Sequence, residues 1–295
     1  MVIVRTNVRE EEIRFDSQHT LFVEGKDEKA IDPTVLRSLL PSSVRVLALG
    51  PSFHVRSAAE ALYPHHPNYY FLIDRDHYDD TFVERCWGNF PDPTTHNLLI
   101  WHRRELENYF IIPEYLSKSQ YLHVSDDRLR DCILDCCRRR LFFDVANQVI
   151  VWVREELKLR WIELFKKVSD FRTKAEALAR LTEAPELALK KKTVAKQLGK
   201  RELMRRFSEV LSQIADGRKH LEYGHGRWLE LLRGKGVLPT VVNRCFRVED
   251  AKGNVLQGRE QLNEIVKDLL GRPLTDQPDD FQKLRDIITA RLSIA

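Results

Sequence analysis

Short apolar runs alternate with amphipathic segments over the first 112 residues of the chain. The runs read TLFVEG, VRVLAL, YYFLI and NLLIWH, at residues 20–25, 44–49, 69–73 and 97–102. Segments with helical spacing follow the first two runs, over residues 27–40 and 53–62. Apolar strands separated by helices of about a dozen residues are typical of βαβ units. The pattern therefore predicts an α/β fold with a parallel sheet flanked by helices.

From about residue 126 the pattern is that of amphipathic helices. A long apolar stripe at helical spacing lies within residues 144–167: Val149, Trp152, Val153, Leu157, Trp161 and Leu164. Further helices are predicted over residues 203–214, 261–270 and 280–292, and the glycine-rich residues 223–236 are expected to bracket one short helix. We therefore expect an α/β core over residues 15–125. A mainly helical part over residues 126–295 would complete the functional site, form a dimer interface, or do both.

Acidic residues follow the first and third predicted strands. Glu24 ends the first strand, Glu28 lies four residues further on, and Asp74 and Asp76 follow the third strand at a spacing of two. Ligands of parallel α/β sheets bind outside the carboxyl ends of the strands, and carboxylates that converge there repel one another unless a cation neutralises them. Oxygen ligands of this kind suit Mg²⁺ or Mn²⁺. The alternative interpretation is that Glu24 is an ordinary surface acid and that Glu28 interacts only with the helix dipole.

Several other polar residues and cysteines are interpreted as structural rather than as metal ligands. We interpret Arg75 as an ion-pair partner, and Asp79 and Asp80 as solvated loop residues. Cys132, Cys136 and Cys137 lack the paired C-x-x-C spacing of zinc sites, so they are expected to be small core residues.

Charge is distributed unevenly along the chain. Residues 1–125 hold 13 Lys and Arg against 18 Asp and Glu, a net charge of −5, and residues 126–295 hold 35 against 26, a net charge of +9. Within residues 186–206, eight Lys or Arg stand against two Glu, which favours either a phosphate-binding surface or a solvated helix face. The odd number of cysteines, five, favours reduced thiols in a cytoplasmic protein. With no apolar run of about 18 residues and no signal-like N-terminus, we expect no membrane association.

Two segments together resemble the Toprim domain of primases, topoisomerases and certain nucleases. They are LFVEGKDE (Leu21–Glu28) and FLIDRDHYDD (Phe71–Asp80), a strand ending in V-E-G followed by a strand ending in D-x-D. The additional acid at Glu28 resembles the OLD-type branch of these nucleases. The segment WHRRELENYFI (Trp101–Ile111) is similar to one in the nuclease (AriB-type) subunit of PARIS anti-phage defence systems.

The resemblance implies a two-metal phosphodiesterase with Mg²⁺ or Mn²⁺ as cofactor. Glu24, Asp74 and Asp76 would hold the metals, with Glu28 as a further ligand or a base that positions water. Glu107 is expected to be the outer acid of the second metal, in preference to Glu105. A basic residue that stabilises transition-state charge is also implied; we assign it to Lys235, with His225 and Arg227 as the competing candidates.

The resemblance also implies an endonuclease that acts as the effector of an anti-phage defence system and cleaves tRNA. The chain holds no G-x-x-x-x-G-K-[ST] loop, and the resemblance implies a separate ABC-type ATPase partner and a homodimer. Two alternatives remain: an OLD-type nuclease that nicks or cleaves DNA, and a nucleic-acid-binding Toprim module without catalysis.

Overall fold

A computed structural model of the chain describes residues 19–27, 30–63, 65–76, 78–91, 97–159 and 185–292. Within these residues one sheet of parallel strands has the order β2-β1-β3-β4. The strands are β1 (Thr20–Val23), β2 (Arg45–Ala48), β3 (Tyr69–Ile73) and β4 (Leu98–Ile100). The predicted α/β class, with a parallel sheet flanked by helices and a helical C-terminal part, is confirmed.

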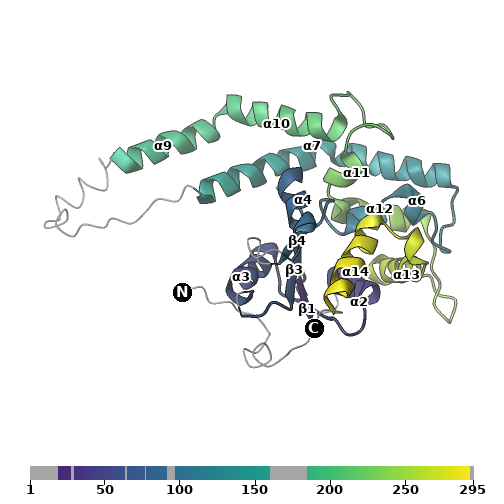
Figure 1. Cartoon of the computed structure of the whole chain (residues 1–295). Coiled ribbons are helices and arrows are strands. Elements are labelled where there is room, and N and C mark those ends of the chain that lie inside the picture. Colours follow the sequence, from purple (N-terminus) through teal and green to yellow (C-terminus); the bar gives the residue numbers. More distant parts are fainter. Residues whose placement is uncertain are drawn as a thin grey trace. The chain divides into compact units, whose positions relative to one another are not determined.

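The order in which strands are added to the sheet switches sides between β1 and β3. The chain passes from β1 to β2 on one side and then crosses to β3 on the other, so β1 and β3 lie side by side with Val23 opposite Leu72. Helix α2 (Ile31–Leu39) packs on β2, α3 (Ser52–Leu62) packs on β3, and α4 (Asp80–Gly88) packs on β4. Because the chain adds β2 on one side of β1 and β3 on the other, right-handed crossovers place successive helices on opposite faces, and Figure 1 shows α3 and α2 on the two sides of the sheet. The carboxyl ends of β1 and β3 therefore lie at the switch point where ligands of such sheets bind.

Helices account for most of the described chain after β4. Their bounds are α5 (Glu107–Phe110), α6 (Pro113–Leu116), α7 (Asp126–Leu159), α9 (Pro185–Gln197), α10 (Lys200–Ala215), α11 (Trp228–Leu231), α12 (Gly234–Cys245), α13 (Gly258–Leu270) and α14 (Asp279–Leu292), with a 3₁₀ turn at Leu274–Asp276. The start of α7 agrees with the predicted change of pattern at about residue 126. Trp161 and Leu164 lie outside the described residues.

The chain divides into two compact units, one formed by residues 1–140 and 228–295 and the other by residues 141–227. In the first unit, α12 packs on α5 and α13, and α13 packs on α2, so residues far apart in the sequence surround the sheet. Trp101, Tyr109 and Phe281 form an aromatic cluster that attaches α14 to the chain after β4. The boundary predicted near residue 125 was a boundary between domains. The division into two packing units does not test it, so it stays a prediction.

Helix α12 was not predicted from the sequence. The short helix expected within residues 223–236 is α11. Gly234 and Gly236 were expected to flank that helix, but they are the first and third residues of α12. Glycine and proline disfavour helix by about 1 and 3 kcal/mol relative to alanine, and α12 also contains Pro239. Tertiary packing therefore overrides local preference here, because Val237, Leu238, Val241 and Val242 of α12 are all buried.

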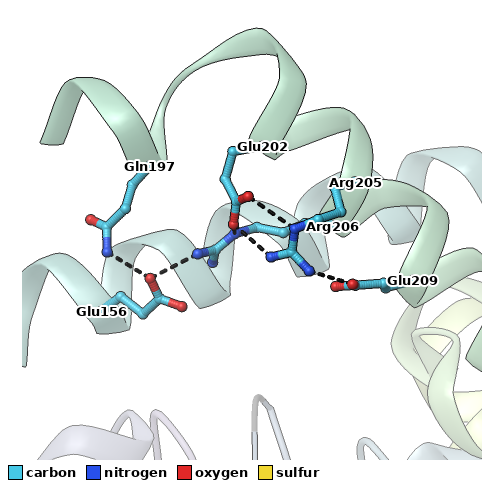
Figure 2. Close-up of polar contacts among 6 residues, drawn as sticks. All are labelled: Glu156, Gln197, Glu202, Arg205, Arg206 and Glu209. Carbon is cyan, nitrogen blue, oxygen red and sulfur yellow. Dashed lines mark hydrogen bonds and ion pairs between the residues drawn. The ribbon is translucent and has the colours of Figure 1, made fainter. Parts of the chain in front are cut away.

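The second unit consists of the C-terminal part of α7 together with α9 and α10. A buried guanidinium, that of Arg206 on α10, donates to Glu156 on α7 at 2.9 Å and to Glu202 at 2.8 Å (Figure 2). Gln197 at the end of α9 donates to the same Glu156 oxygen at 2.7 Å. Arg205 pairs with Glu202 and with Glu209. Arg205 and Arg206 therefore take part in ion pairs within the unit. The other exposed cations of residues 186–206 are Lys191, Lys192, Lys196, Lys200 and Arg201.

The cysteines occupy the core. Cys132, Cys136 and Cys137 are buried on α7, as predicted, and Cys245 is buried at the end of α12. None of the helices in the described parts of the chain is both long and apolar enough to span a membrane.

Candidate active site

Glu24 and Asp74 lie together at the carboxyl ends of β1 and β3. Glu24 directly follows β1 and Asp74 directly follows β3, and the backbone N–H of Asp74 donates to Glu24 Oε1 at 2.8 Å. Gly25 and Gly50 exchange two backbone hydrogen bonds, at 3.0 and 2.8 Å, and so join the ends of β1 and β2. Gly25 has a φ of 154°, and a Cβ there would lie 3.1 Å from Ala30 Cβ. The close approach of these backbones fixes the position of Glu24.

Lys235 reaches this point from α12. Its Nζ donates to Asp74 Oδ2 at 2.6 Å and lies 4.0 Å from Glu107 Oε2. Glu107, the first residue of α5, is only 6% exposed, and Asp74 is 4% exposed. Asp74 Oδ1 and Glu107 Oε2 are buried and have no hydrogen-bond partner among the described residues. The structure thus brings Glu24, Asp74, Glu107 and Lys235 together from four elements.

Asp76 is also close to these groups, but its backbone does not continue the extended conformation of β3. Its φ is +45°, so it lies in a left-handed turn beyond the end of β3, a conformation that Asp tolerates better than most residues. Its side chain is exposed and interacts electrostatically with both Glu24 and Asp74. Glu28 lies outside the described residues, and its predicted role stays a prediction.

A hydrogen-bonded clamp formed by Glu105 and Asn108 holds the first turn of α12. Glu105 is buried and accepts from Arg233 Nε and from the backbone N–H of Lys235, each at 2.9 Å. Asn108 Oδ1 accepts from the backbone N–H of Gly234 at 3.1 Å, and its Nδ2 donates to the carbonyls of Leu229 and Leu232. Glu105 thus supports the position of Lys235, and the role of Glu107 as a metal ligand stays a prediction.

Arg75, between the two aspartates, is an ion-pair partner, as predicted. It is buried, donates to the carbonyls of Tyr78 and His102, and pairs with Asp80 Oδ1 at 2.7 Å. Asp79 and Asp80 are exposed, as expected of solvated residues, but both also make contacts that were not predicted. Asp79 caps α4 by accepting from the N–H of Phe82 at 2.8 Å, and Asp80 holds Arg75 in place. Both acids therefore stabilise the turn that follows β3.

The two competing basic candidates belong to the other compact unit. There His225 lies 3.1 Å from Arg218, and the backbone N–H of Arg227 donates to Ile214. Lys235 is the candidate that contacts the predicted carboxylates.

Burial and mutual repulsion raise the pKa values of the carboxylates. Burial and the Asp74 charge raise the pKa of Glu24 to about 8. Burial raises the pKa of Asp74 to about 6 and that of Glu107 to about 7, although Lys235 opposes both shifts. Burial alone would lower the pKa of Lys235, but the surrounding carboxylates raise it, so the ammonium group stays charged. One lysine thus only partly compensates the negative charge at this point.

Asp32 is a further member of this cluster that the sequence analysis did not identify. It lies in the first turn of α2, is 7% exposed, and interacts electrostatically with Asp74, Lys235, Glu107 and Glu24. Val35, Leu36 and Leu39 share the buried face of α2 with it. The signal for Asp32 that was available in the sequence is its helical spacing from these core residues.

The donor set fits a divalent cation of the hard, oxygen-binding kind. Buried carboxylates in excess of the nearby positive charge, with two oxygens that lack hydrogen-bond donors, are the ligands that Mg²⁺ and Mn²⁺ prefer. In the described part of the chain, no three Asp, Glu, His or Cys side chains already converge closely enough to hold an ion. Lys235 instead occupies Asp74 Oδ2, so cation binding requires the side chains to draw together.

Comparisons with protein-family models, curated proteins and solved structures give no match to this chain. The resemblance noted in the sequence therefore stays a prediction, and the functional argument rests on the geometry of the site.

Proposed function

We propose that the chain is a divalent-metal-dependent nuclease that hydrolyses phosphodiester bonds at the carboxyl ends of β1 and β3. The observation that carries the proposal is the environment of Asp74. One of its oxygens binds Lys235, the other is buried without a hydrogen-bond partner among the described residues, and Glu24 lies beside it at the carboxyl edge of the sheet. Uncompensated carboxylates are costly to bury unless they bind a cation in the working protein.

In this proposal Glu24, Asp74, Asp76 and Glu107 would hold Mg²⁺ or Mn²⁺, with Glu28 as a further carboxylate. When bound, such cations lower the pKa of water and stabilise charge on the attacking and leaving oxygens of a displacement at phosphorus. Lys235 supplies an additional positive charge for the phosphate, and the Glu105 and Asn108 clamp keeps it directed at the same point. Arg75 is engaged by Asp80, so it supports the turn rather than the phosphate.

For the substrate and partners the proposal follows the sequence resemblance. We propose tRNA as the substrate, an ABC-type ATPase as the partner that controls cleavage, and a role as effector in anti-phage defence. The exposed lysines of α9 support a polyanionic substrate, because phosphate contacts dominate affinity for both RNA and DNA.

Incubation of the purified chain with total tRNA and with plasmid DNA tests the activity directly. We expect cleavage in the presence of Mg²⁺ or Mn²⁺ and none in EDTA. Cleavage of the plasmid alone would support the DNA-directed alternative. Binding of nucleic acid without cleavage under every metal condition would contradict the proposal and support a binding module.

A further inference from the structure

An exposed aromatic side chain lies close to the first carboxylate of the candidate site. Phe53, in the first turn of α3, is 54% exposed. No other aromatic side chain in the described part of the first unit is exposed to this degree. Gly50, three residues before Phe53, exchanges two backbone hydrogen bonds with Gly25, the residue after Glu24. The Phe53 ring is therefore presented to solvent at the carboxyl edge of the sheet, one short loop from Glu24.

A second group of aromatic and basic side chains follows Asp76. Tyr78 closes the turn beyond β3, because its backbone N–H donates to the carbonyl of Arg75 at 2.9 Å. The rings of Tyr78 and Phe82 are stacked, with centroids 5.1 Å apart and planes inclined by 17°. The guanidinium of Arg85 lies over the Phe82 ring, 4.8 Å from its centroid. Both rings are partly exposed and Arg85 is exposed, so the turn that carries Asp76 is flanked by an accessible aromatic and basic group.

Arg56 of α3 joins these two groups. The connections from β2 to β3 and from β3 to β4 run in the same direction across the sheet, so right-handed crossovers place α3 and α4 on the same face. Arg56 lies three residues after Phe53 and thus on the same side of α3. Its guanidinium lies 5.8 Å from the centroid of the Tyr78 ring. We call these five side chains the aromatic–basic surface: Phe53, Arg56, Tyr78, Phe82 and Arg85.

The chemistry of the aromatic–basic surface fits unpaired nucleotides. Every base has a π face that can stack on an aromatic ring whatever the sequence, and neighbouring cations attract the phosphates. In a double helix the faces of the bases are covered by adjacent base pairs, so proteins stack aromatic side chains on bases of unpaired segments. The guanidinium groups over Tyr78 and Phe82 do not block such stacking. A cation–π contact of an exposed side chain is weaker than base–aromatic stacking, so a base can replace the guanidinium, which then pairs with a phosphate.

We propose that the aromatic–basic surface holds unpaired nucleotides of the substrate beside Glu24 and Asp76. The inference rests on the proposed function and specifies its substrate class, a single-stranded segment of nucleic acid such as a loop rather than a double helix. It also gives a role to the first turns of α3 and α4, which the sequence motifs do not assign.

Fluorescence anisotropy of a short labelled RNA in EDTA tests this inference without cleavage. The same RNA is offered to the full chain as a single strand and annealed to its complement. We expect the single strand to bind at least about tenfold more tightly than the duplex. Phe53→Leu and Phe82→Leu should each weaken binding of the single strand by at least about fivefold, because one base loses its stacking partner, and should leave the affinity for the duplex unchanged. Phe53 is exposed, so its variant carries the test even if Phe82→Leu does not fold.

Tyr121→Leu is the matched control. Tyr121 is partly exposed, as Phe82 is, but its carbonyl accepts from the N–H of Arg247, beyond the last residue of α12. The 12 residues of that helix separate this position from the turn of Lys235 by about 18 Å. This variant should bind both forms of the RNA as the wild type does.

The outcomes separate this inference from the proposed function. If the wild type binds the duplex as tightly as the single strand, or if Phe53→Leu and Phe82→Leu bind the single strand as the wild type does, the inference is overturned. The aromatic–basic surface is then a packing contact between α3 and α4, and metal-dependent cleavage by the wild type would still support the proposed function. If the two variants lose affinity for the single strand but the wild type cleaves nothing under any metal condition, the surface stands and the nuclease function is wrong.

Discussion

At the scale of single residues, the site is a balance between one ammonium group and several buried carboxylates. Lys235 contacts Asp74 directly and lies near Glu107, and these neighbours keep its ammonium group charged. The carboxylates remain protonated to higher pH than in an unfolded chain. The metal-free protein therefore retains protons that a bound cation would displace.

This balance predicts that the metal-free protein loses stability as the pH rises. Glu24, with a pKa of about 8, holds a proton in the folded state that the unfolded chain has released above about pH 4.5. Because the folded state binds more protons over this window, its free energy of unfolding falls by up to about 1.4 kcal/mol per pH unit for each such proton. Denaturant unfolding in EDTA from pH 5 to 8 should show the decline, and Glu24→Gln should reduce its slope. Equal slopes for the wild type and the variant would show that Glu24 ionises normally.

At the scale of elements, the first turn of α12 links the helical part of the first unit to the sheet edge. Gly234 lies against Asn108, where a Cβ would be 2.6 Å from the backbone nitrogen of Asn108. Gly236 lies two residues further along, and the three atoms nearest to a Cβ there would all belong to the flexible end of the Arg140 side chain. The two glycines thus differ in whether a methyl group can be accommodated.

We predict opposite effects for the same substitution at these positions. Gly234→Ala must push the α5 backbone away from α12, so it should destabilise the protein by about 1–3 kcal/mol and reduce nucleic-acid cleavage by displacing Lys235. Gly236→Ala is the matched control; Arg140 can move aside and alanine favours helix by about 1 kcal/mol, so stability should change little or rise. Thermal unfolding and cleavage rates of both variants provide the test, and similar losses in both would contradict the role given to the Gly234 contact.

The elements show which parts of the molecule could be predicted from the sequence. The strands were predicted because their apolar runs are buried by helices on both faces, and Glu24, Asp74 and Asp76 followed from the position of strand ends. Helix α12 could not be predicted because contacts between distant segments overcome its glycines and Pro239. Asp32 was missed because no motif contains it and its burial depends on how α2 packs. The ion pair of Asp80 was not predicted because its partner, Arg75, turns back toward it only in the folded chain.

At the scale of the whole molecule, the excess positive charge of residues 126–295 predicts nucleic-acid affinity. Lys191 and Lys192 on α9 are exposed, and Lys190 is partly so. Substitution of all three by Glu should weaken tRNA binding. It should also reduce the slope of log affinity against log salt concentration by up to about two units. The matched control reverses the exposed Lys219, Lys252 and Lys267 in the same way and should leave the slope nearer to that of the wild type. Equal slopes in the two triple variants would identify α9 as a solvated helix face.

The second unit also carries a concentration of exposed apolar side chains. In the described residues of this unit they are Phe142, Phe143, Ile150, Leu189, Val194, Leu198 and Met204. Contiguous patches of exposed apolar side chains are typical of protein–protein interfaces, and we propose that these side chains join two copies of the chain. Light scattering should give the mass of a dimer for the wild type and of a monomer for a variant with Leu189→Glu and Met204→Glu. A monomeric wild type at all accessible concentrations would contradict this proposal.

The measurement that tests the central claim most directly is the initial rate of nucleic-acid cleavage by Glu24→Gln. The substitution keeps the shape of the side chain but removes the charge that faces Asp74 at the sheet edge. Its control is Glu60→Gln, the same change at an exposed position on α3.

We predict that Glu24→Gln lowers the rate in Mg²⁺ by at least about a hundredfold, while folding and tRNA binding persist and Glu60→Gln retains the wild-type rate. Asp76→Asn should behave as Glu24→Gln does, and the double variant should be no worse than either single one, because the residues act as a unit. A wild-type rate in Glu24→Gln, or cleavage by the wild type that continues in EDTA, would contradict the account.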